Sequence, residues 1–414
     1  MKLKCRPEDF LVTELSEFPI RAKGEFAVYE LTKRGIGTPE AITQLLQMWK
    51  LPREKLSYGG LKDRHAVTKQ FVTVHRGPAR NAQRDQWDLG YLGQSDEPFH
   101  PTNISANRFQ IVMRDMEAEE CQRAISALDE VAVWGLPNYF DDQRFGSVTS
   151  AGEFIARPWI AGDYEKTLWL GLAAESPHDR SAEKREKATL RDHWGDWPTV
   201  MKRLGRSHRR SIISYLVQHP QDFKGAWARV RQDMRSLYLS AFQSHLWNKI
   251  LSTAIRSTCP EEKRVEVRLA LGPAPFFREL PTNATIDLAT LMIPLPSSRS
   301  IYEDDAPITA LTDLVLATEG LSRDEIKIKH PRDSFFSKGE RAAVIRATDV
   351  TRVEGEDTLY KGKRSLQLSF CLPRGCYATI LIKRITAAAG SHDDAPSSDD
   401  HDSDAAEQHD ESAQ

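Results

Sequence analysis

The stretch Gly59-Gly60-Leu61-Lys62-Asp63-Arg64-His65-Ala66-Val67-Thr68-Lys69-Gln70 carries more information than any other part of the chain. Its carboxylate, Asp63, lies between Lys62 and Arg64, and nearby positive charge favours the ionised form of a carboxylate. An ionised carboxylate can attack electrophilic carbon as a covalent nucleophile. The glycines in front of it let the backbone bend sharply and approach a ligand. The pattern indicates a reactive carboxylate, and a solvated turn is the alternative explanation.

A second segment, Pro137-Asn138-Tyr139-Phe140-Asp141-Asp142-Gln143-Arg144-Phe145-Gly146, combines aromatic, amide and guanidinium groups within ten residues. Aromatic faces stack on unpaired bases, and Arg and amide groups hydrogen-bond base edges or phosphates. A turn that buries Tyr139, Phe140 and Phe145 under a neighbouring element has the same composition. The segment therefore fits either an RNA contact or a packed turn.

Together these segments resemble the TruD family of pseudouridine synthases, which isomerise uridine in tRNA. Five segments carry the resemblance in the family's order: residues 4–14, 60–70, 107–109, 137–146 and 372–379. The most specific strings are Lys-Asp-Arg-His-Ala-Val-Thr in the first motif, and Asn-Tyr-Phe followed by Gln-Arg-Phe-Gly in the second. The segments span most of the chain, so the resemblance covers more than one local motif.

The resemblance implies roles for single residues. Asp63 matches the family's nucleophile, and its substrate contacts match Phe10, Asn107 and Tyr377. Phe109 lies two residues after Asn107, on the same side of an expected strand, and is a candidate stacking ring. Phe10 and Phe109 would otherwise be ordinary core residues. Tyr377 stands where Phe looks usual in bacterial relatives, and its hydroxyl needs a partner if it is buried.

Five further residues are candidates for a supporting role in the site: Lys4, Glu14, Lys62, Arg64 and Arg144. Lys4, Glu14 and Arg144 match family-typical positions. Lys62 and Arg64 are expected to keep Asp63 ionised or to contact phosphate.

The implied reaction breaks the N1–C1′ bond of a flipped-out uridine, turns the uracil and rejoins it through C5; the family's usual target is uridine 13 in the D-arm. Extruding the uridine costs a few kcal/mol, which contacts in the pocket must offset. Attack of the carboxylate at C6, attack at C1′ and stabilisation of a glycal all remain open. The reaction requires no metal and no cofactor, and the sequence holds no P-loop, dinucleotide fingerprint or His/Cys cluster.

Two other functions compete with the isomerase. An RNA chaperone could use the same cleft without turnover, but a pure binder has no use for a carboxylate beside RNA phosphates. A nuclease could place a metal on Asp63 and Glu14, but it would need further carboxylates.

The charge of the chain is unevenly distributed. The formal net charge is −2, yet residues 391–414 carry nine acids and no Lys or Arg, which leaves the rest of the chain with 57 basic and 50 acidic residues, a net charge of +7. The basic body suits an RNA partner. The acidic tail, taken as 387–414, lacks large apolar residues and is expected to be disordered.

The remaining composition indicates a soluble, cytoplasmic protein. The five cysteines form no Cys-x-x-Cys pair, which suits a reducing compartment. The sequence shows neither the ~20-residue apolar run of a membrane span nor a signal peptide. We expect tRNA as the partner, no membrane contact, no implied protein partner and a monomer.

Apolar spacing predicts several elements. A helix is expected over 38–51, with Thr38 as its cap and Pro39 at its first position. Apolar runs predict strands at 71–75 and 109–113, the second followed by an amphipathic helix.

Toward the C-terminus, alternation over 365–370 predicts a half-buried strand, and 227–255 reads as a long helix whose aromatics belong to the core. The resemblance adds the domain plan: an α+β fold, with a catalytic domain of residues 1–134 and 339–386 around a mixed or antiparallel sheet. An inserted, largely helical α/β TRUD domain would span 135–338.

The middle of the chain is basic. Residues 178–210 contain ten Lys or Arg against five acids. They end in the cluster Lys202, Arg203, Arg206, His208, Arg209 and Arg210. Phosphate binding and a solvated helix face explain the cluster about equally well.

Overall fold

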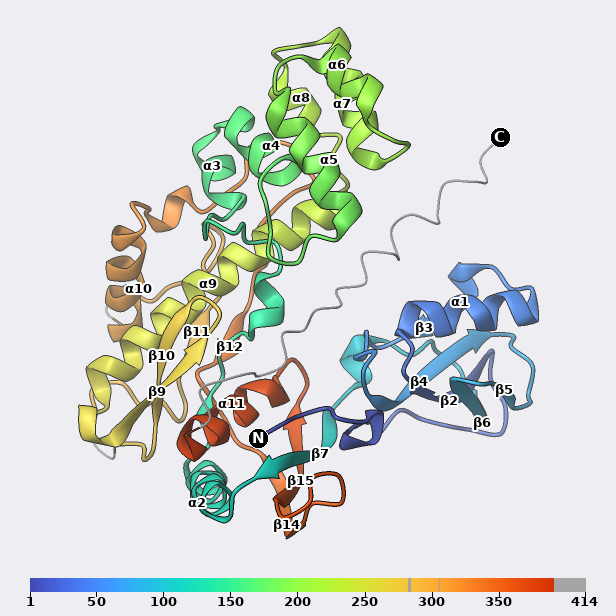
Figure 1. The fold of residues 1–414 in the computed structure, drawn as a ribbon, viewed down its shortest axis with the longest axis vertical. Coiled ribbons are helices and arrows are strands. Elements are labelled where there is room, and N and C mark those ends of the chain that lie inside the picture. Colours follow the sequence, from blue (N-terminus) through green and yellow to red (C-terminus); the bar gives the residue numbers. More distant parts are fainter. Residues whose placement is uncertain (282–283, 305, 391–414) are drawn as a thin grey trace. The chain divides into compact units, whose positions relative to one another are not determined.

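The computed structural model describes residues 1–281, 284–304 and 306–390. The described residues divide into two compact units: Met1–Leu136 with the chain from Ile345 onward, and Pro137–Val344 (Figure 1). In the sequence, the second unit is therefore inserted into the first. The predicted domain boundaries and the assignment of catalysis to one unit stay predictions. The predicted acidic tail lies outside the described residues from 391 onward, and its first residues, up to Ala389, belong to a helix.

The first unit is built on one mixed sheet. Its described strands follow the order β14-β15-β7-β1-β4-β2-β6-β5, with β3 paired to β4. Only β1 and β4 run parallel; the other pairs are antiparallel. The strands are β1 (Phe10–Leu15), β2 (Phe26–Arg34), β3 (Leu56–Tyr58), β4 (Val67–His75), β5 (Ala82–Arg84), β6 (Trp87–Ser95), β7 (Ala106–Met116), β14 (Thr348–Glu356) and β15 (Arg364–Pro373). The α+β class with a mixed sheet, expected from the sequence, is confirmed.

In the described part of this unit, the sheet is accompanied by the helices α1 (Thr38–Trp49), α2 (Ala118–Trp134) and α11 (Ala378–Ala389). Ile42 and Leu45 of α1 share a buried cluster with Tyr29 and Leu31 of β2. The helices α2 and α11 lie side by side and α2 packs on β14 and β15 (Figure 1). The first unit is thus built from segments on both sides of the insertion, because β14, β15 and α11 follow it in the sequence.

The start of α1 corrects one expectation. The cap residue is Gly37, not Thr38, and the Gly37 N–H donates to Glu40 at 2.8 Å. The Thr38 hydroxyl donates instead to Gln70 Oε1 at 2.9 Å and accepts from the Lys62 N–H at 3.1 Å. Thr38 therefore ties the helix to the loop that carries Asp63, a tertiary contact that outweighs the local preference of Thr for a cap position.

The second unit is mainly helical and surrounds the long helix α9 (Gln232–Thr258). Its other helices are α3 (Ala156–Ala161), α4 (Tyr164–Leu172), α5 (Ser181–Asp192), α6 (Trp197–Arg203), α7 (His208–Gln218), α8 (Phe223–Trp227) and α10 (Pro307–Thr318). Short strands complete it: β9 (Arg264–Leu269), β10 (Gly272–Phe277), β11 (Met292–Pro294) and β12 (Glu340–Ala342), with β8 (Leu136–Pro137) and β13 (Val344–Ile345) at the junctions with the first unit.

The core of this unit confirms the helix expected over 227–255. Tyr238, Phe242, Leu246 and Ile250 of α9 are all buried, so its aromatics belong to the core. Their spacing of four residues places them on one face, which packs against the neighbouring helices. The predicted region begins earlier, because Trp227 ends the separate helix α8.

The strand predictions are confirmed with longer bounds. The run 71–75 belongs to β4, and 109–113 belongs to β7, which the predicted helix follows as α2. In β15, Leu366, Leu368 and Phe370 are fully buried, whereas Gln367 between them is exposed. That alternation is what one buried face of a sheet requires.

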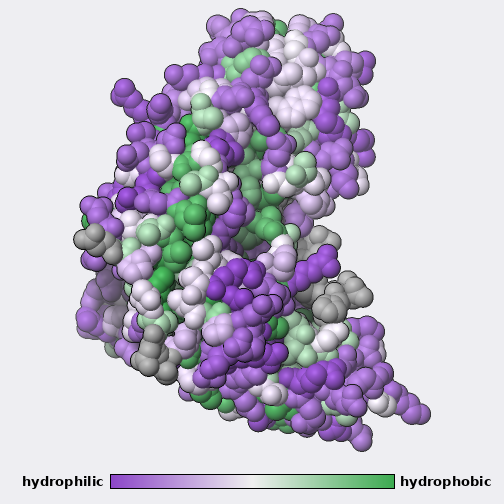
Figure 2. All heavy atoms as spheres, turned by 90° about the vertical axis from the view of Figure 1, so that its left-hand side faces the viewer, coloured by the Kyte–Doolittle hydropathy of each residue, from purple (hydrophilic) through white to green (hydrophobic). Residues whose placement is uncertain are grey.

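The surface is predominantly hydrophilic on the face drawn in Figure 2, with hydrophobic side chains gathered in patches. Among the described residues, none of the helices combines the length and the apolar character needed to cross a bilayer.

Candidate active site

Asp63 lies in the loop between β3 and β4, and its carboxylate is held from two directions. Lys4 Nζ forms an ion pair with Oδ2, and the His65 backbone N–H donates to Oδ1 at 3.0 Å. The side chains of Lys4 and Asp63 are 17% and 27% exposed. The carboxylate is therefore fixed in place while part of it stays open to solvent.

The pKa of Asp63 lies below its ordinary value. Burial is the largest single influence and acts to raise this pKa, but the charge and hydrogen bond of Lys4, with the His65 N–H, together lower it by more. Asp63 is thus ionised at neutral pH, as the sequence predicted, although the cation responsible comes from a different part of the chain.

The two cations next to Asp63 in sequence also contact other residues, and their expected role, to keep Asp63 ionised or to contact phosphate, stays a prediction. Lys62 Nζ lies 2.7 Å from Glu14 Oε1 and donates to Asn107 Oδ1 at 3.0 Å. Arg64 forms an ion pair with Glu40 at the start of α1. Lys4 approaches the carboxylate from another segment of the chain.

The backbone of Asp63 is held by a buried lysine that the sequence reasoning missed. Lys33 Nζ donates to the carbonyl oxygens of Asp63 at 2.6 Å and Ile36 at 2.8 Å. Burial lowers the pKa of Lys33 to about 8, partly opposed by the charges of Asp63 and Glu40. A neutral amine still has two N–H groups, so both hydrogen bonds can persist after the proton is lost. The alternation of β2 could have indicated this burial, because Lys33 falls at the position that follows Tyr29 and Leu31 on the buried face of the strand.

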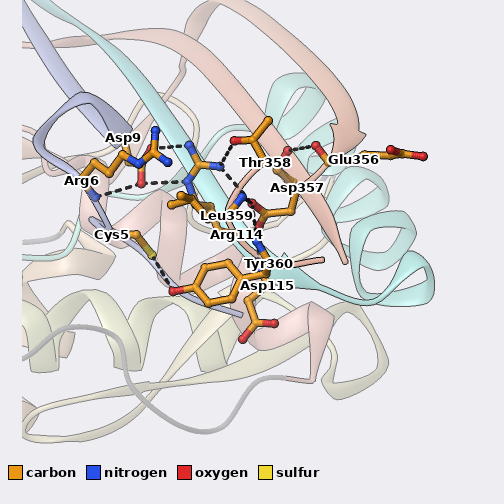
Figure 3. A network of polar contacts seen from close by, with 11 residues as sticks. Cys5, Arg6, Asp9, Arg114, Asp115, Glu356, Asp357, Thr358, Leu359 and Tyr360 are labelled. Carbon is orange, nitrogen blue, oxygen red and sulfur yellow. Dashed lines mark hydrogen bonds and ion pairs between the residues drawn. The ribbon is translucent and has the colours of Figure 1, made fainter. Parts of the chain in front are cut away.

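A second missed residue, Arg114 of β7, anchors the N-terminal segment that carries Lys4 (Figure 3). Its guanidinium donates to both carboxylate oxygens of Asp9, at 2.9 and 2.7 Å, and to Asp357 at 3.1 Å. Bidentate pairs of this kind fix orientation as well as charge. Asp9 directly precedes Phe10, and Lys4 adopts a φ of +52°, uncommon outside glycine. The buried cluster thus holds in place a segment with an unusual backbone conformation.

The two candidate stacking rings lie together in the sheet. Phe10 and Phe109 are 7% and 8% exposed, and their ring centroids are 6.4 Å apart in an edge-on arrangement. Phe109 also stacks on Phe370 at 5.5 Å, and Lys4 Nζ lies 4.6 Å from the centroid of Phe10. Phe10 therefore borders the Lys4–Asp63 pair, whereas Phe109 packs between Phe10 and Phe370 on the same face of the sheet.

Two further candidates, Tyr377 and Arg144, belong to other elements. Tyr377 is half-buried and occupies the position before the first residue of α11. Arg144 belongs to the second unit, where its Nε donates to Ser244 at 3.2 Å and its guanidinium lies over the Phe140 ring. The roles of Phe10, Asn107, Phe109, Tyr377 and Arg144 in substrate binding stay predictions.

Comparison with known proteins decides the family. The model of tRNA pseudouridine synthase D (TruD) matches residues 1–274 and 276–385. The chain belongs to the TruD family. It is thus a member of a family of isomerases named for the pseudouridine they form in tRNA.

Relatives and a solved structure agree over nearly the whole TruD chain. A probable tRNA pseudouridine synthase D from Methanococcus maripaludis is 30% identical over 394 residues, covering 93% of this chain and 99% of the relative. The tRNA pseudouridine synthase D of Aquifex aeolicus is 26% identical, covering 93% and 98%. The crystal structure of a putative TruD from Methanosarcina mazei has the same fold, with a TM-score of 0.71, 23% identity and 93% coverage of both chains.

The second TruD motif forms a packed turn. Tyr139, Phe140 and Phe145 are all buried, so the alternative of a turn with buried aromatics is correct for these three rings. The Tyr139 hydroxyl donates to the carbonyl of Pro275 at 3.0 Å, and the Phe140 ring lies edge-on to Trp247. The rings therefore anchor the motif in the second unit and are not free to stack on bases.

The basic cluster divides into two groups. Arg209 is paired with Glu183 and Glu186 of α5, and Arg210 donates to the carbonyls of Met201 and Leu204. These two arginines hold helices together, which overturns the expectation that the whole cluster either faces solvent or binds phosphate. The other four members of the cluster, Lys202, Arg203, Arg206 and His208, are exposed, and His208 Nε2 accepts a hydrogen bond from the Arg231 backbone N–H.

Proposed function

We propose that this chain converts a flipped-out uridine of tRNA, uridine 13 in the D-arm, to pseudouridine, with Asp63 as the reacting carboxylate. The observation that carries the proposal is the Lys4–Asp63 pair, because it presents an ionised carboxylate that is fixed but still partly exposed. A solvated turn would leave the carboxylate unpaired, and a structural ion pair would bury it.

The reaction is an isomerisation, so atoms balance without a second substrate. The N1–C1′ bond breaks, C5 bonds to C1′, a proton leaves C5 and N1 gains one. The carboxylate of Asp63 acts on C6 of the base, on C1′ of the sugar or on the charge of a glycal. Lys4 keeps the carboxylate ionised, the His65 N–H restrains its rotation, and Lys33 holds the backbone carbonyl of Asp63. Phe10, Asn107 and Tyr377 supply the pocket that offsets the cost of extruding the base.

Asp63→Asn tests the proposal. The amide has nearly the shape of the carboxylate but cannot attack carbon, so we expect no pseudouridine while tRNA affinity stays near that of the unaltered protein. The measurement is pseudouridine formation in uridine-labelled tRNA without added metal, together with tRNA binding. The matched control is Asp96→Asn, which alters an exposed carboxylate paired with Arg21.

The same assay separates the competing functions. If the unaltered protein binds tRNA but never turns it over, it is a chaperone, and if it cuts the strand on adding a divalent cation, it is a nuclease. Wild-type turnover by Asp63→Asn would remove Asp63 from the chemistry, and conversion only at another uridine would correct the position.

A further inference from the structure

Lys62 joins the buried carboxylate of Glu14 to the partly exposed amide of Asn107. Its Nζ lies 2.7 Å from Glu14 Oε1 and donates to Asn107 Oδ1 at 3.0 Å. Glu14 and Asn107 are direct cross-strand partners in β1 and β7, so their side chains share one face of the sheet. The three residues therefore form a chain that runs from the sheet to the partly exposed Asn107.

This chain is built in advance of any substrate. The side chain of Glu14 is 0% exposed and that of Lys62 is 10% exposed. Glu14 Oε2 accepts from the Phe71 backbone N–H at 2.9 Å, and the Lys62 N–H donates to Thr38. Both ends of the ion pair are fixed to backbone or to a buried side chain, so Lys62 holds a set position below Asn107.

The position of Lys62 decides which end of the Asn107 amide faces the substrate. An ammonium group donates hydrogen bonds and accepts none, so the amide oxygen must point toward Lys62. The NH2 group then occupies the other end of the same amide. Among the described residues, no side chain or carbonyl accepts a hydrogen bond from it. Asn107 is thereby turned from a group that could donate or accept into a donor.

We propose that Lys62 and Glu14 are positioning residues that hold the Asn107 NH2 toward the O4 carbonyl of uracil and so select uridine over cytidine. The inference rests on the proposed function. Uracil carries a carbonyl oxygen at C4, whereas cytosine carries an amino group there, and both share the O2 carbonyl. A fixed donor bonds the first and opposes the second, and a site that leaves buried polar groups unpaired rejects a base strongly. A donor that bonded only the O2 carbonyl could not distinguish uracil from cytosine.

The experiment uses the full chain and short tRNA-derived RNAs with uridine, 4-thiouridine or 2-thiouridine at the target position. Sulfur accepts hydrogen bonds less well than oxygen, so each analogue weakens one carbonyl. For the unaltered protein, 4-thiouridine should lower kcat/KM by about fivefold to tenfold, the worth of one hydrogen bond. The value for 2-thiouridine should stay within about twofold of that for uridine.

The decisive variant is Lys62→Met with Glu14→Gln, because removing one partner alone would leave a buried charge. Without Lys62 the amide can turn, so the ratio of uridine to 4-thiouridine should fall toward one. Asn107→Asp gives a second test that keeps the pairing with Lys62 but offers no donor, and its ratio should also fall toward one.

A matched control removes a similar buried pair from the second unit, Lys187→Met with Asp179→Asn. Its ratio should equal that of the unaltered protein. A ratio that survives in the Lys62 double variant or in Asn107→Asp overturns the inference, and so does an effect of 2-thiouridine in place of 4-thiouridine. Absence of turnover on uridine itself overturns the proposed function and the inference together, whereas turnover with an unchanged ratio overturns the inference alone.

Discussion

Each unit of this molecule contains a Lys–Asp pair of nearly the same construction. Asp63 receives an ammonium from Lys4 and one backbone N–H, and Asp179 receives an ammonium from Lys187 and the backbone N–H of Ser176. The difference is exposure. The side chain of Asp179 is 4% exposed and that of Asp63 is 27% exposed.

The comparison teaches that contacts alone do not separate a reactive carboxylate from a structural one. A buried pair contributes to the fold, and removing one partner leaves an uncompensated charge. A pair of the same geometry at the surface of a loop keeps its charge and can still meet a substrate. Access, more than bonding, makes Asp63 the candidate.

The largest effects are expected when each of the two aspartates is replaced by Asn, because one replacement should affect stability and the other turnover. Asp179→Asn should lower the free energy of unfolding by about 3 kcal/mol, because the buried Lys187 would keep only the more distant carboxylate of Glu183, 3.8 Å away. Pseudouridine formation per folded molecule should not change. Asp63→Asn should do the opposite, with turnover lost and stability nearly kept. Urea unfolding and the tRNA assay, run on both variants, measure the two quantities.

If Asp179→Asn lost turnover while fully folded, or if Asp63→Asn unfolded the chain, the two pairs would not differ in kind. Asp96→Asn serves both assays as the reference for an exposed pair.

Lys4→Met should produce a smaller effect that depends on pH. The pKa of Asp63 is lowered mainly by Lys4 against the opposing influence of burial, so loss of Lys4 should raise this pKa. Turnover needs the ionised carboxylate, so activity falls as the pH drops through the pKa, and in the variant that fall should begin at a higher pH. The measurement is the pH profile of kcat, with Lys4→Arg expected to restore most of the acid side. A variant whose profile only scales down, without moving, would show that Lys4 serves geometry and not charge.

Arg114→Lys should act in the same direction as Lys4→Met but more weakly. It keeps the charge beside Asp9 and Asp357 but loses the bidentate contact that orients the N-terminal segment. Lys4 would then spend less time beside Asp63, and the acid side of the profile should move by less than in Lys4→Met. An unchanged profile with reduced stability would make the arginine purely structural.

The sequence predicted the parts of this site that are local and missed those that depend on distant partners. Asp63 stood out because its flanking residues form a recognisable string, and the strands stood out by their alternation. Lys4, the cation that pairs with Asp63, could not be identified from the sequence. The two residues are 59 positions apart and meet only when β1 and β4 pair in parallel.

The contacts of Arg114 could not be predicted from the sequence for the same reason. Its partners Asp9 and Asp357 lie 105 and 243 residues away in sequence, so no local pattern relates them. Thr38 is a residue type that often caps helices, but its hydroxyl donates to Gln70 and accepts from the Lys62 N–H instead. These partners become available only when α1 packs against the sheet.

The smallest expected effect concerns the basic cluster. Substituting Lys202, Arg203 and Arg206 together by Ala removes exposed charge and should weaken tRNA binding, with kcat at saturation unchanged. If all three contact phosphate, the slope of log affinity against log salt should become shallower by about 2.7, since each released contact contributes about 0.9.

Arg209→Ala with Arg210→Ala should instead destabilise the second unit, because these side chains hold α5 and the end of α6, and should leave the salt slope as it was. Binding across a salt series and thermal unfolding of both variants distinguish the groups. Equal slopes for the exposed-cluster variant and the unaltered protein would mean that the three exposed cations only solvate their helix face, and that tRNA is held by other charges of the basic body.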